Sequence, residues 1–108
     1  MSKIQPEALR GVAFQIILES GDARSVIHEA FILMRESKFS EAEAKLELAK
    51  DAIIKAHSAQ ADLLQKYASG INFDTDILII HAQDHLMASQ TLKEVALEML
   101  YLHRKVAE

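Results

Sequence analysis

Apolar residues return every three or four positions along most of this chain. The first such series starts just after Pro6 and continues through Leu9, Ala13 and Ile16, which is the spacing of one face of an α-helix. Proline suits the first turn of a helix because its missing N–H would have no partner there. No segment shows the strict alternation of a half-buried β-strand. The pattern predicts an all-α protein whose first helix begins near Pro6.

The segment 20–24 interrupts this first series, and Val26 and Ile27 then resume it. Gly21 lies within the interruption, and glycine destabilises a helix interior by about 1 kcal/mol relative to alanine. We therefore expect either one long helix kinked near Gly21 or two short helices in series.

A second helix is predicted from about residue 40 to Tyr67. Ser40 and Glu43 have the spacing of a capping box, in which each side chain satisfies a backbone N–H near the other residue. The sequence that follows is rich in alanine, leucine, glutamate and lysine, which are strong helix formers. Gly70 is the expected stop, because glycine readily adopts the left-handed conformation that closes a helix.

A third helix follows the loop 72–75, with Asp74 or Thr75 as its expected N-cap. No glycine or proline interrupts it before the basic segment 103–105, whose charges suit a helix C-terminus. The three helices together predict one domain over residues 1–108, folded as an antiparallel three-helix bundle in up-down-up order.

The third helix carries apolar residues on nearly every side. At about 100° per residue, one cluster lies on one face and a second cluster roughly opposite it; the first comprises Ile77, Ala88, Val95 and Leu102, and the second Ile79, Leu86 and Leu97. Two neighbouring helices can cover only part of such a surface. We therefore expect a homo-oligomer.

Asp84 falls within the first apolar cluster, in the heptad row that also holds Ile77 and Thr91. A carboxylate on an apolar seam is costly unless it is paired or bound to a cation. Two interpretations stay open: a partly exposed Asp in a local salt bridge, or symmetry-related copies of Asp84 that share a divalent cation. Oxygen-only ligation would favour a hard ion such as Mg²⁺.

Composition narrows the class of protein further. The chain has 12 basic and 16 acidic residues, a net charge of -4 and no cysteine. This balance provides no electrostatic footprint for nucleic acid or anionic lipid, and the missing cysteines exclude disulfides and thiolate chemistry. Neither a signal peptide nor an apolar run of about 18 residues is found. We expect a soluble cytoplasmic domain without membrane insertion.

The segment 80–87 holds the densest group of reactive side chains, with His85 one helical turn after His81 and with Gln83 and Asp84 between them. A His pair at this spacing could bind zinc, although no third ligand is evident. Alternatively, His81 could carry a phosphoryl group, because neutral imidazole is a good nucleophile near pH 7, with Gln83 and His85 donating hydrogen bonds to the phosphoryl oxygens. In a third interpretation both histidines have only a structural role, on the helix surface or in the core.

The block His81-Ala-Gln-Asp-His-Leu-Met87 resembles the active-site signature of the enzyme IIA components for lactose, cellobiose and related disaccharides (diacetylchitobiose among them) in the phosphoenolpyruvate-dependent sugar phosphotransferase system. Three further blocks resemble the same family in the same order, so that the similarity extends over essentially the whole chain; they are Ser20-Gly-Asp-Ala-Arg-Ser25, Phe39-Ser-Glu-Ala42 and Ala56-His-Ser-Ala-Gln60.

The resemblance implies a role for each residue of the block. His81 would be the phosphorylated residue, with Gln83 and His85 supporting it. Asp84 would lie at the axis of a homotrimer and contribute to a divalent-cation site. The phosphoryl donor would be the carrier protein HPr, and the acceptor a cysteine of the cognate enzyme IIB, during uptake of a disaccharide.

Two other classes compete with this interpretation. A histidine phosphotransfer domain of two-component signalling also displays a histidine on a helical bundle, but it lacks the His-Ala-Gln-Asp-His block. A non-catalytic oligomeric metal-binding helical protein would bind zinc through His81 and His85. His28 follows a helix break, and helix-dipole complementarity is explanation enough for His103 near a helix C-terminus. His57 belongs to the matched second-helix block, where a structural hydrogen bond is favoured over a role as phosphoryl relay.

Overall fold

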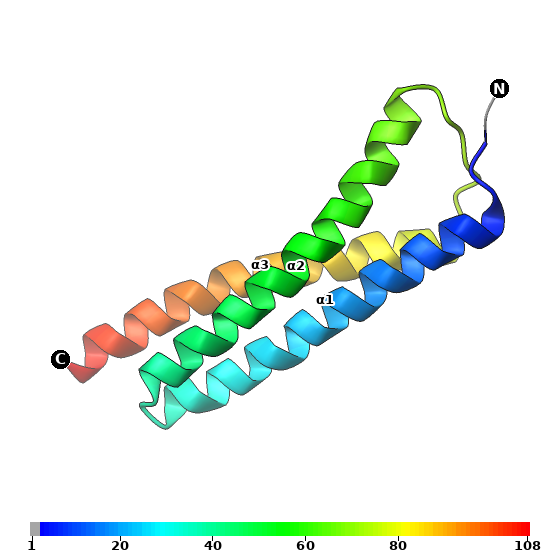
Figure 1. The fold of residues 1–108 in the computed structure, drawn as a ribbon. Coiled ribbons are helices and arrows are strands. Elements are labelled where there is room, and N and C mark those ends of the chain that lie inside the picture. Colours follow the sequence, from blue (N-terminus) through cyan, green and yellow to red (C-terminus); the bar gives the residue numbers. More distant parts are fainter. Residues whose placement is uncertain (1–2) are drawn as a thin grey trace.

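The computed structural model describes residues 3–108, which form three long helices (Figure 1). They are α1 (Pro6–Arg35), α2 (Phe39–Ala68) and α3 (Ile77–Ala107). α2 runs antiparallel to the other two, and its second half diverges from them in Figure 1. α1 packs against both α2 and α3, whereas α2 and α3 contact each other less extensively. The all-α class and the three-helix order are confirmed.

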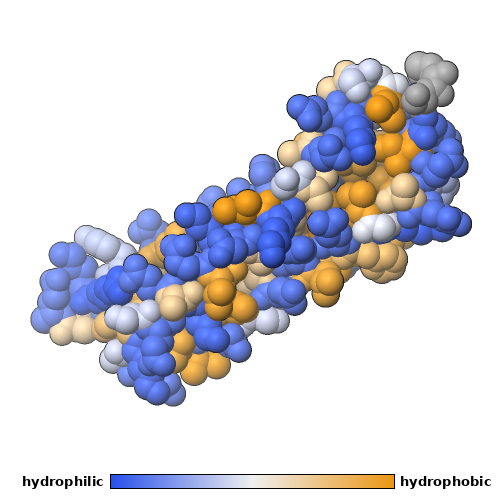
Figure 2. Space-filling view, viewed as in Figure 1, coloured by the Kyte–Doolittle hydropathy of each residue, from blue (hydrophilic) through white to orange (hydrophobic). Residues whose placement is uncertain are grey.

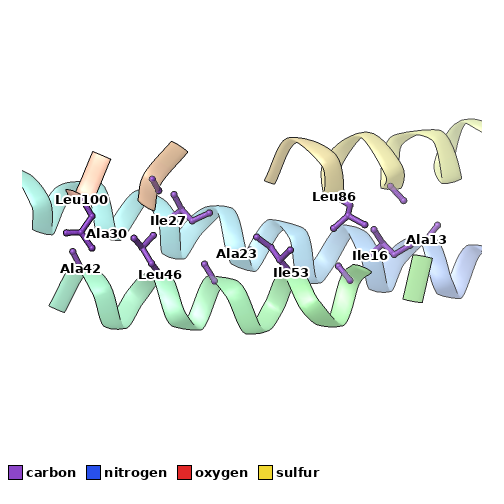
Figure 3. Packing of buried hydrophobic residues seen from close by; sticks show 14 of the residues in the cluster. Ala13, Ile16, Ala23, Ile27, Ala30, Ala42, Leu46, Ile53, Leu86 and Leu100 are labelled. Atoms are coloured by element: carbon purple, nitrogen blue, oxygen red, sulfur yellow. The ribbon is translucent and has the colours of Figure 1, made fainter. Parts of the chain in front are cut away.

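The core is built on buried positions whose spacing alternates between four and three residues. On α1 these positions are Leu9, Ala13, Ile16, Ser20, Ala23, Ile27, Ala30 and Met34. This heptad-like spacing keeps one narrow seam facing the partner helices. The seam of α1 mixes large side chains with small ones. Figure 3 shows buried side chains of all three helices meeting in the core. Long helices can therefore stay packed over most of their length.

α1 passes through Gly21 as one uninterrupted helix, so the prediction of two short helices in series is wrong. Ser20 and Ala23 are fully buried and continue the core row without a break. They resemble an interruption in the sequence because they are small, not because they leave the core. Ser89 on α3 donates a hydrogen bond of 3.1 Å to the carbonyl oxygen of Ser20, which ties the two helices together here. The kink near Gly21 stays a prediction.

The predicted capping box at the start of α2 is wrong. Lys38 is the N-cap and its side chain makes no capping hydrogen bond, so Ser40 lies inside the first turn. Phe39 packs partly buried against the core, and this contact draws the helix start back to residue 39. The tight turn before it places Ser37 at φ 61°, in the left-handed region.

The loop between α2 and α3 ends α2 as predicted. The N-cap of α3, however, is a different residue from the two that were predicted. Gly70 has φ 99°, as expected for a helix stop. The cap of α3 is Asp76, not Asp74 or Thr75: its carboxylate accepts hydrogen bonds of 3.1 Å from the backbone N–H groups of Leu78 and Ile79. Asp74 instead pairs with Lys3 at 2.8 Å.

We predict that Asp76→Ala lowers the free energy of unfolding by about 1 kcal/mol, the usual cost of removing an N-cap carboxylate. Thermal or urea unfolding would measure the change. Asp74→Ala is the matched control in the same loop, because its ion pair with Lys3 is exposed and such pairs contribute about 0–1 kcal/mol. Equal destabilisation by the two variants would contradict the assignment of Asp76 as the cap.

Candidate functional site

His81 and His85 lie side by side on the outer surface of α3. His81 is exposed and His85 is half-buried. Their rings meet edge to face, with centroids 5.1 Å apart and planes at 71°. Nδ1 of His85 is buried and has no hydrogen-bond partner within residues 3–108. Nε2 is therefore the nitrogen that His85 can offer to a ligand beside His81.

The packing of α3 decides which way His81 points. Ile79, Ala82 and Leu86 are buried to 2% exposure or less and fix the rotation of the helix about its axis. The Asp76 cap fixes its first turn. His81 follows in the second turn and projects away from the buried row. The structure thus brings His81 and His85 together as the sequence predicts.

Asp84 is exposed and makes no ion pair within the described part of a single chain. The local salt bridge, one of the two interpretations of Asp84, is therefore not found. Large apolar side chains stay exposed along the same face of α3, with Ile77 at 80% and Leu102 at 55%. Hydrophobic patches are also visible between hydrophilic residues on the face of the molecule shown in Figure 2. In the single chain, the outer side of α3 is thus an exposed apolar seam that contains the Asp84 carboxylate.

Gln83 lies away from His81. It is half-buried and lines a pocket with Leu64 and Tyr67 of α2 and with Phe73 of the loop. Two residues of helix correspond to a rotation of about 200°, so Gln83 and His81 occupy nearly opposite flanks. The same rotation of about 100° per residue that predicted the His81–His85 pair also places Gln83 away from His81. Sequence reasoning missed this when it assigned Gln83 as a hydrogen-bond donor beside His81.

The structure groups two histidines that sequence reasoning left apart. His28 and His103 line one groove between α1 and α3, together with Arg35, Phe31 and Met99. The sequence signal that could have identified this groove is the heptad spacing along α1 and α3, which run parallel to each other. His57 is exposed on α2 and takes no part in this group.

A metal site within one chain is not supported. No group of three histidine, aspartate or glutamate side chains within residues 3–108 is placed to hold a metal ion. His81 and His85 thus lack the third protein ligand that a zinc site needs. Among the described helices, none is both long and apolar enough to cross a membrane.

The chain is similar to several known proteins over nearly its whole length. The family model described as "PTS system, Lactose/Cellobiose specific IIA subunit" matches residues 11–104. The lichenan-specific phosphotransferase enzyme IIA component of Bacillus subtilis is 38% identical over 94% of this chain and 93% of its own length. The crystal structure of PtcA from S. mutans is 54% identical, with a TM-score of 0.92 over 94% of this chain and 99% of that one.

A third similarity is to a complex. The IIA(Chitobiose) chain solved together with HPr from Escherichia coli is 29% identical, with a TM-score of 0.76 over 93% of this chain and 97% of that one. These matches agree in family, length and helix arrangement. The chain belongs to the lactose/cellobiose-specific IIA subunits, the phosphotransferase components of a bacterial sugar uptake system.

Proposed function

We propose that His81 accepts a phosphoryl group from phosphorylated HPr and passes it to a cysteine of the cognate enzyme IIB in the cytoplasm, during uptake of a disaccharide. The observation that carries this proposal is the exposed His81 beside the half-buried His85 on a rigidly packed helix. The solved complex of a similar IIA chain with HPr supports the choice of donor. Family membership argues against the histidine phosphotransfer domain of two-component signalling.

The transfer needs little beyond positioning. Nε2 of neutral His81 attacks the phosphorus of the donor phosphohistidine, and the donor's P–N bond breaks with its electron pair returning to the donor ring. In the second transfer the acceptor thiolate attacks, and the His81 P–N bond breaks in the same way. Charge develops on the phosphoryl oxygens in each step, where hydrogen-bond donors stabilise it. Nε2–H of His85 is one such donor in this chain.

The exposed seam on α3 supports assembly as a homotrimer. Ile77, Val95 and Leu102 are each about half exposed or more in the single chain, and covering them with other copies removes this apolar surface from water. A threefold axis along the seam would bring three copies of Asp84 together. Like charges so close repel one another unless a cation lies between them.

Asp84 fits a shared cation site but not a site of its own. One chain offers a single carboxylate here, whereas three copies would supply an all-oxygen set of ligands suited to Mg²⁺. When bound, the cation would neutralise the three carboxylates and hold the subunits together. It has no part in the phosphoryl transfer described above.

His81→Ala is expected to abolish phosphorylation. The measurement is incubation with phosphoenolpyruvate, enzyme I and HPr, followed by intact mass at alkaline pH, because phosphohistidine is acid-labile. The parent chain should gain one phosphoryl mass and the variant none. His57→Ala, which removes an exposed histidine on α2, is the control and should behave as the parent. No gain in the parent while HPr is demonstrably phosphorylated would contradict the proposed function.

Asp84→Asn is expected to remove a dependence on divalent cations. For the parent, chelation with EDTA should weaken the trimer in sedimentation equilibrium, because three unshielded carboxylates then face one another. The variant keeps the side-chain shape without the charge, so its assembly should be the same with EDTA and with Mg²⁺. A parent trimer that ignores EDTA would contradict the cation site, and a stable monomer would contradict the assembly.

A further inference from the structure

We propose that the buried hydroxyl of Ser20 on α1 serves Nδ1 of His85 on α3 as its hydrogen-bond partner, directly or through one water molecule. In this way Ser20 holds the His85 ring as a donor toward the phosphoryl group on His81. Ser20 is a positioning residue, because it acts through His85 and touches neither the phosphoryl group nor a partner protein. This role rests on the proposed function of His81.

Two buried polar atoms beside the histidine pair are left without partners. Oγ of Ser20 and Nδ1 of His85 are both almost completely removed from water, and neither has a hydrogen-bond partner within residues 3–108. Ser20 as a whole is 0% exposed. Buried polar groups are hydrogen-bonded with few exceptions, so each of these two atoms needs a partner.

An observed hydrogen bond places Ser20 next to the helical turn that carries His85. The hydroxyl of Ser89 donates to the carbonyl oxygen of Ser20 at 3.1 Å. His85 precedes Ser89 by four residues, so the two side chains lie one above the other on the same side of α3. α1 and α3 run in the same direction (Figure 1). The turn of α3 that begins at His85 therefore lies beside the turn of α1 that ends at Ser20.

The His85 side chain lies on the side of α3 that faces α1. Met99 follows His85 by 14 residues, or two heptads, and so occupies the same side of the helix. Met99 shares a groove with Phe31 of α1. Two heptads before Phe31, the corresponding position on α1 is Ile17, three residues before Ser20. The buried edge of the His85 ring therefore faces the part of α1 that contains Ser20.

The two atoms are also chemically complementary. A neutral imidazole carries one N–H group and one nitrogen with a free lone pair, and a serine hydroxyl can donate to that lone pair. If Ser20 donates to Nδ1, the ring proton of His85 must be on Nε2. The third buried polar atom without a partner among the described residues, Oε1 of Gln60 on α2, can only accept and so cannot serve this lone pair.

The position of the ring proton decides whether His85 assists the transfer. With the proton on Nε2, His85 donates a hydrogen bond to the phosphoryl oxygens on His81, whose ring centroid lies 5.1 Å from its own. With the proton on Nδ1, Nε2 presents a lone pair to those oxygens and repels them. The hydrogen bond that one ring nitrogen makes determines which nitrogen holds the proton, and Ser20 supplies that bond.

A different arrangement is available to Ser20 and gives different results. A serine hydroxyl inside a helix can bond to the carbonyl oxygen of the residue four positions earlier, which here is Ile16. Oγ of Ser20 does not make that bond in the structure, and a change of one side-chain rotamer redirects it. If Ser20 bonded to Ile16, it would stabilise α1 only and would have no influence on His85.

NMR of the imidazole nitrogens tests the contact in the unphosphorylated protein, with the His85 signals assigned by their loss in His85→Ala. The parent should hold the His85 proton on Nε2, and Ser20→Ala should show a mixture with the proton on Nδ1. Ser89→Ala is the matched control. It removes a hydrogen bond to the Ser20 carbonyl but keeps the Ser20 hydroxyl, so the proton should stay on Nε2.

Kinetics test the consequence for phosphoryl transfer. Ser20→Ala should slow the phosphorylation of His81 by phospho-HPr about two- to tenfold, the effect of one hydrogen bond. The concentration of HPr at half the maximal rate should not change, because a buried side chain cannot contact HPr. In a His85→Ala background, Ser20→Ala should have no further effect, since the two residues act as one unit.

A second pair of variants isolates the hydroxyl from any change in packing. Ser20→Thr and Ser20→Val have nearly the same shape and differ in the hydroxyl alone. Ser20→Thr should keep the proton on Nε2 of His85 and should be phosphorylated faster than Ser20→Val by the same factor. Equal rates for the two variants would overturn the role of Ser20.

The remaining outcomes separate this role from the proposed function. A parent proton on Nδ1, an unchanged proton position in Ser20→Ala, or equal slowing in the His85→Ala background overturns the role of Ser20 and leaves His81 as the carrier. A parent that phospho-HPr does not phosphorylate overturns the carrier role instead. The NMR measurement needs no phosphorylation, so it still decides whether Ser20 and His85 are in contact.

Discussion

The rotation of α3 about its own axis is set by its buried row, and the site depends on that rotation. Ile79, Ala82 and Leu86 face α1 and α2 and are almost completely removed from water. Burying a side chain such as leucine contributes about 1.5–3 kcal/mol. Turning the helix by one residue, about 100°, would expose that row. The helix therefore has one favourable orientation, and every other side chain on it follows from that choice.

The rotation of α3 also determines which residues each side of the helix presents. The side opposite the core is left with apolar residues and Asp84, which a single chain cannot cover or neutralise. The flank near α1 presents His81 and His85, with Nδ1 of His85 directed inward. The flank near α2 presents Gln83. The proposed carrier role requires that His81 be accessible to a donor and an acceptor in turn, and its exposed position on a packed surface helix meets this requirement.

The single chain leaves the outer side of α3 uncovered for a simple physical reason. A bundle of three helices can bury only the facing sides of each helix, so the outer side of α3 remains exposed although it is apolar. Assembly through this side of α3, as proposed above, would remove that apolar surface from water.

The sequence by itself determined the helices, their order and the pairing of His81 with His85. Periodicity and i to i+4 spacing are local properties, and long uninterrupted helices express them faithfully. Sequence reasoning was wrong about the N-terminal caps of α2 and α3 and about two short helices meeting at residues 20–24. There, the packing of Phe39, the choice of Asp76 as cap and the burial of Ser20 depend on neighbours distant in the chain. Only the tertiary structure decided that Gln83 faces α2 and that His28 and His103 share a groove, because these placements depend on which side of each helix its neighbours occupy.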